Sequence, residues 1–265
     1  MIKQKNIDKV FNLFLFTHLL IWTLVPFLTN RNLPLDTIEA LAWGSNLEWG
    51  YSKHPPLSAY LSEFFYFIFG NNDWAYYLLS QICVVLSFFV IFKFSKEFFK
   101  NSYLAFLSVV VLEGIYFYNF TTPEFNVNIA QLPFWSLTIY FSWRCIKKEK
   151  QLDYIFLGLF AGLGILSKYL FIYLALGISL LFVYLIKKRK KIFLKNYLAA
   201  ILTTCLVLLP HIIWLIDNQF PSIEYGFSRT GGVGNFFEHF SLPLIFLAKQ
   251  ILLLIPFLFL IFLIV

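Results

Sequence analysis

Charged residues are scarce in this sequence of 265 residues: aspartate, glutamate, lysine and arginine together make up 13% of it. Hydrophobic residues make up 60%, and the mean hydropathy is +0.74. A soluble domain carries about 25% charged residues, so this composition excludes an ordinary soluble protein. Apolar runs of about 20 residues, the length that crosses a membrane as a helix, recur along the chain instead.

Cysteine is also scarce, and its placement limits what it can do. Cys83, Cys145 and Cys205 all fall within apolar runs. This is typical of buried small residues, so we expect neither a disulfide framework nor a cysteine-based metal site. The sequence also lacks a phosphate-binding glycine loop and a dinucleotide-binding fingerprint. No cofactor is therefore indicated, although a divalent metal stays open.

The apolar runs predict an all-α fold, a polytopic transmembrane helical bundle of about eight spans. The first run follows a basic N-terminus and lacks a small-residue cleavage site, so we interpret it as a retained signal anchor. Residues 57–70 are apolar but short, and we expect a helix along the outer membrane interface, with Glu63 toward water. The candidate spans are residues 10–28, 74–95, 102–119, 125–145, 154–167, 169–186, 196–216 and 243–265.

The net charge of +7 is distributed unevenly between the connecting loops. The positive-inside rule places basic loops in the cytoplasm, which makes the N-terminus cytoplasmic and residues 29–73, 119–124 and 217–242 external. The charge thus orients the chain and favours contact with membrane lipids, whereas nucleic acid is not expected as a partner. Sixteen of the 21 basic residues form four clusters: Lys3, Lys5, Lys9; Lys93, Lys96, Lys100; Arg144, Lys147, Lys148, Lys150; and residues 187–191 with Lys195.

Two acids in the first outer segment, Asp36 and Glu39, are three residues apart in a short helix predicted to begin after Pro34. Such a pair can share a proton, or one acid can act as a base while the other orients a substrate. Alternatively, Asp36 caps the helix and Glu39 favours its positive end. Both interpretations stay open at this point.

Lys53 and His54 directly precede Pro55 and Pro56, which stiffen the chain and set the start of the next helix. Held at this point, the two cations can neutralise a phosphate at the membrane surface. The alternative is a solvated loop beside a helix start.

Polar side chains also begin the fourth span, where Glu124 is followed by Asn126 and Asn128. Polar groups that enter an apolar helix face a cavity or a partner, although an acid at a helix start is also ordinary capping. Lys168 lies between two apolar runs, where it can reach water or meet a lipid-linked phosphate.

Three further features complete the candidates. Arg229 in the last outer segment can contact phosphate, and Gly231, Gly232 and Gly234 beside it are consistent with a mobile lid. We expect Glu113 to be paired within the bundle and His211 to be a hydrogen-bonded core histidine.

The chain resembles the family 39 type of GT-C glycosyltransferases, the bacterial relatives of dolichyl-phosphate-mannose protein mannosyltransferases and of the aminoarabinose transferase that acts on lipid A. The resemblance implies that Asp36 is the base or acceptor-orienting acid. Thr37 stands where members often carry a second acid, and whether Glu39 replaces that acid stays open. It extends from the first span to about Trp214 and rests on LDTIEALAWGSNLEWGYSKHPPLSAYL, TTPEFNVNIAQLPFW and GLGILSKYLF.

The resemblance likewise implies that Glu124 belongs to the catalytic set and that the Lys53-His54 pair and Lys168 bind the phosphate. The residues themselves add Asn126, Tyr169 and Arg229 as candidates for binding substrate or phosphate. Members use a polyprenyl-phosphate sugar as donor, glycosylate a lipid or glycan acceptor, and work at the periplasmic face of the bacterial inner membrane. They are usually longer, so we expect a C-terminal portion beyond this single domain of residues 1–265. Two alternatives remain: a transporter or flippase for lipid-linked or anionic solutes, and an inactive relative.

Overall fold

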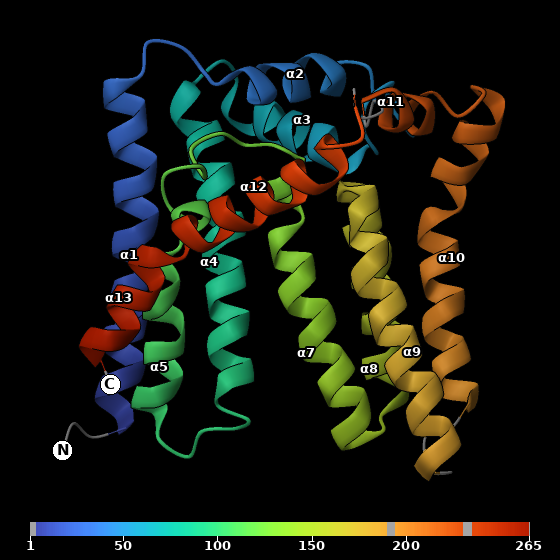
Figure 1. Cartoon of the computed structure of the whole chain (residues 1–265). Helices are drawn as coiled ribbons and strands as arrows, with labels where there is room; N and C mark the ends of the chain where they lie inside the picture. The colour runs from blue at the N-terminus through green and yellow to red at the C-terminus, as the bar shows by residue number, and fades with distance from the viewer. Residues whose placement is uncertain (1–3, 190–193, 230–234, 265) are drawn as a thin grey trace.

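The computed structural model describes residues 4–189, 194–229 and 235–264. Its described secondary structure is helical throughout, as predicted, and the long helices stand side by side while shorter ones cover one end of the bundle (Figure 1). The α-helices are α1 (Gln4–Thr29), α2 (Leu35–Gly44), α3 (Leu57–Phe69), α4 (Asp73–Ser95), α5 (Ser102–Val110), α6 (Val127–Ala130), α7 (Leu132–Lys148), α8 (Gln151–Ser167), α9 (Ile172–Arg189), α10 (Leu194–Asp217), α11 (Pro221–Arg229), α12 (Glu238–Leu253) and α13 (Ile255–Ile264).

Within the described residues, five helical segments are long and apolar enough to cross a membrane: Asn6–Thr29, Asp73–Ser95, Tyr169–Lys188, Leu194–Asp217 and Glu238–Leu263. Shorter apolar helices cover Leu57–Phe69, Ser102–Gly114 and Gln151–Ser167. This pattern confirms the predicted polytopic helical bundle.

The segment expected as one span at residues 102–119 is instead broken. Helix α5 ends at Val110, and two 3₁₀ turns, Val111–Gly114 and Tyr116–Tyr118, follow it. Polar side chains hold this turn region: His18 Nδ1 lies 2.6 Å from Glu113 Oε1, and Asn119 Nδ2 donates to the Glu113 carbonyl at 2.7 Å. The expected pairing of Glu113 within the bundle is therefore confirmed, with His18 of α1 as its partner.

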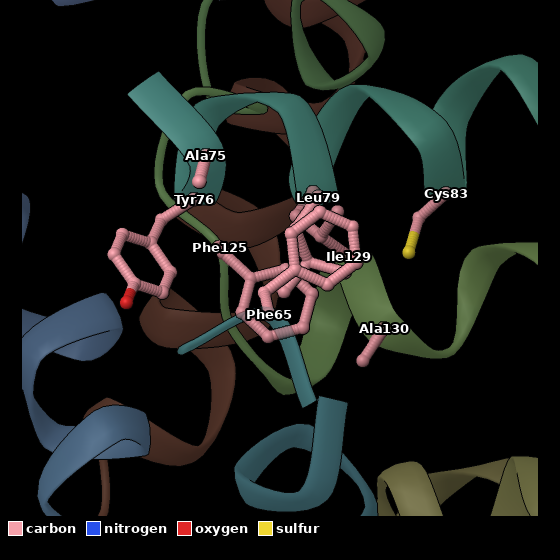
Figure 2. Close-up of a cluster of buried hydrophobic side chains, with 8 residues drawn as sticks. All are labelled: Phe65, Ala75, Tyr76, Leu79, Cys83, Phe125, Ile129 and Ala130. Atoms are coloured by element: carbon pink, nitrogen blue, oxygen red, sulfur yellow. The ribbon is translucent and has the colours of Figure 1, made fainter. Parts of the chain in front are cut away.

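A buried cluster fixes the start of α4 against α3 and the segment that leads into α6 (Figure 2). Phe125 is fully buried, and Phe65 of α3 and Leu79 of α4 belong to the same cluster. Burying a large apolar side chain contributes about 1.5–3 kcal/mol. The cluster therefore holds the residues around Phe125 at a fixed place below α2 and α3. Its members are Phe65, Ala75, Tyr76, Leu79, Cys83, Phe125, Ile129 and Ala130.

Helices α2, α3 and α11 lie across one end of the bundle, which we call the capped end (Figure 1). As predicted, α2 begins directly after Pro34 and α3 directly after Pro56. The two helices cross closely at Gly44, where a Cβ atom would lie 2.8 Å from the Ala59 carbonyl oxygen. The short helix α3 thus packs on α2 across the end of the bundle.

Ion pairs connect neighbouring helices at the opposite end, which we call the basic end. Lys96, directly after α4, bonds Asp8 of α1 at 2.5 Å, and Lys147 of α7 bonds Glu97 at 2.5 Å. Both pairs use lysines of the clusters that the sequence places in one set of loops. The basic loops and the capped end therefore lie at opposite ends of the bundle (Figure 1).

Candidate functional site

Four of the predicted site residues line one small pocket at the capped end. Asp36 and Glu39 reach it from α2, His54 from the loop before α3, and Asn126 from the start of α6. The remaining lining residues are Ala40, Trp43, Ser58 and Val127. Residues that are up to 91 positions apart in the sequence, Asp36 and Val127, thus surround one space, because α2 is docked onto the segment before α6.

Two hydrogen bonds produce this docking. Thr37 is 1% exposed, and its Oγ1 donates to the Phe125 carbonyl at 3.1 Å. The Glu124 carboxylate accepts from the backbone N–H of Asp36 at 3.2 Å. Glu124 therefore satisfies a free N–H in the first turn of α2, where a negative charge is also favoured by the helix dipole.

The three candidate acids consequently have different surroundings. Glu39 forms an ion pair with Lys53, and Glu124 is bound to the start of α2. The exposed carboxylate of Asp36 has neither an ion pair nor a hydrogen bond with any described side chain. Among these acids, Asp36 is the one whose carboxylate is available to a ligand.

The pKa values of Lys53 and His54 are shifted in opposite directions, the first by a neighbouring charge and the second by burial. The hydrogen bond to Glu39 raises the pKa of Lys53, so Lys53 stays protonated. Burial lowers the pKa of His54, and the Lys168 charge lowers it further while Glu39 opposes this. An unperturbed histidine titrates near pH 6.5, so His54 is mainly neutral at pH 7.

Lys168 lies in the connection between α8 and the 3₁₀ turn before α9, and its Nζ bonds Asn128 Oδ1. Burial, followed by the nearby Arg229 charge, lowers the pKa of Lys168. Asn126, two residues before Asn128, uses its side-chain oxygen to cap α6 by accepting from the Asn128 N–H at 2.9 Å. The cap fixes the backbone that carries the partner of Lys168.

Helix α11 adds residues from the last outer segment. Arg229 Nη1 bonds the Tyr225 hydroxyl at 2.7 Å, and the Tyr225 ring lies 6.0 Å from Lys53 Nζ. The rings of Tyr225 and His54 meet edge to face, with centroids 6.4 Å apart. The structure therefore brings Arg229 to the side of the site that carries Lys53. The predicted lid glycines Gly231, Gly232 and Gly234 lie outside the described residues.

Tyr169 directly follows Lys168, but its hydroxyl is bonded to protein groups. It lies 2.8 Å from His211 Nε2 and 2.6 Å from Ser222 Oγ. His211 is 2% exposed, and its Nδ1 lies 2.6 Å from the Trp49 carbonyl oxygen. The prediction of a hydrogen-bonded core histidine is thus confirmed.

Several residues of the site have no clear signal in the sequence. Thr37 departs from the family pattern, and its hydroxyl docks α2 onto the segment before α6. Tyr225 and Ser222 lie on α11, within a segment that the sequence predicts only as external. Across the described ranges, no three histidine, cysteine, aspartate or glutamate side chains converge in a way that holds a metal ion.

A family model described as dolichyl-phosphate-mannose-protein mannosyltransferase matches residues 53–214. The match covers more than half of the chain, and the chain belongs to this family of membrane glycosyltransferases. It is an integral membrane protein by its apolar helices. Asp36 and Arg229 lie outside the matched range, so their placement rests on the geometry described above.

Two curated relatives are glycosyltransferases. A lipopolysaccharide core galacturonosyltransferase RgtA of Rhizobium johnstonii is 24% identical over 189 residues, which cover 71% of this chain and 38% of the relative. An undecaprenyl phosphate-alpha-4-amino-4-deoxy-L-arabinose arabinosyl transferase of Wigglesworthia glossinidia brevipalpis is 26% identical over 188 residues, 63% of this chain and 33% of the relative. The chain thus matches little more than a third of their length. No solved structure matches it.

Proposed function

We propose that this protein transfers a sugar from a polyprenyl-phosphate donor to an acceptor hydroxyl of a glycolipid, lipopolysaccharide or protein. The capped end is the proposed periplasmic face of the bacterial inner membrane. One observation carries the proposal: the unpaired Asp36 carboxylate lines a pocket beside protonated Lys53. The charge of nearby Lys168 lowers the pKa of His54, which lines the same pocket. A base next to cations suits transfer from a phosphate leaving group.

In the proposed reaction, Asp36 accepts the proton of the acceptor hydroxyl. The acceptor oxygen forms a bond to the anomeric carbon while the bond from that carbon to the phosphate oxygen breaks. The electron pair leaves with the polyprenyl phosphate, which needs no general acid. Single displacement inverts the anomeric configuration.

Charge complementarity assigns the phosphate to the cations around the pocket. Lys53 is held protonated by Glu39, and Lys168 bonds Asn128, two residues after Asn126 of the pocket lining. Arg229 is exposed on α11 and its guanidinium can form two parallel bonds to a phosphate. His54, being mainly neutral, supplies a hydrogen bond but little charge.

The test uses the full chain, purified and returned to native membranes that provide the acceptors. Radiolabelled undecaprenyl phosphate-4-amino-4-deoxy-L-arabinose and a polyprenyl-phosphate galacturonate are supplied as donors, and labelled glycan is measured. We expect Asp36→Asn to reduce transfer by about 10²–10⁴-fold, the usual contribution of a general base. Asp8→Asn, which removes an acid at the basic end, is the matched control and should retain activity.

Each outcome separates the competing functions. Transfer that persists in Asp36→Asn would show that Asp36 is not the base. Labelled lipid that crosses the bilayer without sugar transfer would identify a transporter. Absence of both from the wild-type chain would indicate an inactive relative.

A further inference from the structure

A part-buried hydrogen-bonded chain joins four segments around the candidate site. Ser222 of α11 lies 2.6 Å from the Tyr169 hydroxyl, which lies 2.8 Å from His211 Nε2 in α10. The other ring nitrogen of His211 lies 2.6 Å from the Trp49 carbonyl oxygen in the first loop. Two of its members are buried, because Ser222 and His211 are each 2% exposed.

The donor directions in this chain follow from its last member. A carbonyl oxygen only accepts, so His211 Nδ1 carries a proton and donates it to Trp49. In the neutral ring, Nε2 then accepts from the Tyr169 hydroxyl, and the tyrosine oxygen accepts from Ser222. Each of the three side chains has a partner in this arrangement. A chain that ends on a carbonyl has no base to receive a proton, so its role is to hold groups in place.

The groups held in place are those assigned above to the donor phosphate. Tyr169 directly follows Lys168, and Ser222 lies in the first turn of α11, which also carries Tyr225 and Arg229. The Trp49 carbonyl belongs to the loop that continues to Lys53 and His54. Within this series of hydrogen bonds, His211 is thus the residue that contacts both the first loop and Tyr169.

Tight packing keeps the ring of His211 in its orientation. It stacks between the Tyr169 ring, with centroids 5.7 Å apart, and the Trp214 ring, at 6.2 Å. Trp214 in turn donates to Glu48 Oε2 at 3.1 Å, and a Cβ atom at Gly50 would lie 2.3 Å from its ring. The first loop therefore lies directly on the end of α10.

We propose that His211 is a positioning residue for donor binding, which sets Lys168, Arg229 and the Lys53 loop at a common distance from the phosphate. The proposal rests on the proposed transferase function and goes beyond it, since His211 itself does not contact the pocket. A displacement of about 1 Å at positioned groups can reduce rate about 10²-fold. Loss of the hydrogen bonds should therefore weaken donor binding without removing the base.

The experiment compares Tyr169→Phe, His211→Asn and His211→Ala in the same membrane assay, with undecaprenyl phosphate-4-amino-4-deoxy-L-arabinose and polyprenyl-phosphate galacturonate varied. Asparagine retains a donor for the Trp49 carbonyl but loses the contact to Tyr169. Phenylalanine retains the stacked ring and loses the hydroxyl. Tyr184→Phe on α9, which loses one exposed hydrogen bond from Lys188, is the matched control.

We expect KM for the donor to rise about tenfold in Tyr169→Phe and His211→Asn, and further in His211→Ala, with a smaller change in kcat. The double variant of Tyr169→Phe and His211→Asn should equal Tyr169→Phe alone, because that variant already lacks the contact to His211 together with the one to Ser222. Tyr184→Phe should retain the wild-type KM.

A merely structural role gives a different result: the melting temperature and the active fraction fall together while KM is unchanged. That result overturns the positioning role. Effects of the two single variants that add up in the double variant would overturn it as well. Failure of the proposed function is recognised separately, since the wild-type chain would then transfer no sugar from either donor.

Discussion

Asp36 and Glu39 belong to one turn of α2, yet the structure separates their roles. Glu39 is neutralised by Lys53, and the pKa of Lys53 is raised by the same contact. Asp36 keeps an unpaired carboxylate, while its backbone N–H is bound by Glu124. The spacing of the two acids predicts their shared face, but only the tertiary contacts decide which of them is available as a base.

The role of Thr37 is one that the sequence pattern does not predict. Members of the family often carry a second acid at this position, and the sequence leaves open whether Glu39 replaces it. The side chain at this position is instead buried and donates a hydrogen bond to the Phe125 carbonyl. A carboxylate there would face a carbonyl oxygen and lose that donor, which costs about 1–3 kcal/mol or more for a buried polar group. The partner that explains Thr37 lies 88 positions away, so local pattern cannot supply it.

The pKa of Lys168 leads to a prediction at the same scale. Burial and the Arg229 charge both lower the pKa of Lys168, so its ammonium is lost at a lower pH than that of a free lysine. Donor binding should weaken as pH rises through this pKa. The variant Arg229→Gln removes the Arg229 charge, so the pKa of Lys168 should move up. The rise of KM should therefore begin at higher pH in this variant.

The measurement is KM for the donor between pH 7 and 10, for the wild type and for Arg229→Gln. Because Arg229 itself is assigned to the phosphate, the variant should also have a several-fold higher KM at pH 7. Lys93→Gln removes an exposed cation near the basic end of α4 and should leave the profile unchanged. If KM begins to rise at the same pH or at a lower pH in Arg229→Gln, the coupling between Arg229 and the pKa of Lys168 is contradicted.

Helices α8 and α10 show how packing between elements supports the site. They carry Lys168 and His211 at their capped ends, and they cross closely at Gly158. A Cβ atom at Gly158 would lie 2.2 Å from the Ala200 carbonyl oxygen, and Thr204 Oγ1 also donates to the Gly158 carbonyl at 3.0 Å. The spacing of Gly158, Gly162 and Gly164 in the sequence predicts close approach of helices, although it does not name α10 as the partner.

Gly158→Ala should therefore force α8 and α10 apart and destabilise the protein by about 1–3 kcal/mol, the usual cost of overpacking. Gly177→Ala on α9 is the matched control, because no atom lies within 4 Å of the position of its Cβ. That variant should be neutral or stabilised by up to about 1 kcal/mol through helix propensity. Thermal unfolding of the detergent-solubilised protein measures both. Equal melting temperatures for the two variants would show that the crossing tolerates a methyl group.

At the scale of the whole molecule, composition and charge predict a polytopic bundle with its polar segments on one side. The broken segment after α5 could not be predicted, because its turns depend on His18 and on contacts with α13. The segment expected as one span at residues 243–265 is likewise two helices that meet at Leu254. Apolar runs specify membrane affinity, whereas breaks within them depend on tertiary partners.

The orientation of the bundle gives the last prediction. The capped end should face the periplasm, because the basic loops lie at the opposite end. Single cysteines are introduced as Asn46→Cys, exposed in the first loop, and Lys150→Cys, exposed between α7 and α8. The background carries Cys83→Ala, Cys145→Ala and Cys205→Ala.

In intact spheroplasts, a membrane-impermeant maleimide should label Asn46→Cys at once and Lys150→Cys only after permeabilisation. Detection of labelled protein on a gel is sufficient, and labelling of both variants in detergent is the control for thiol access. The reverse pattern would place Asp36, Lys53 and Lys168 in the cytoplasm. A polyprenyl-phosphate donor presented at the periplasmic surface could then not reach them. The labelling experiment therefore tests both the topology and the proposed donor.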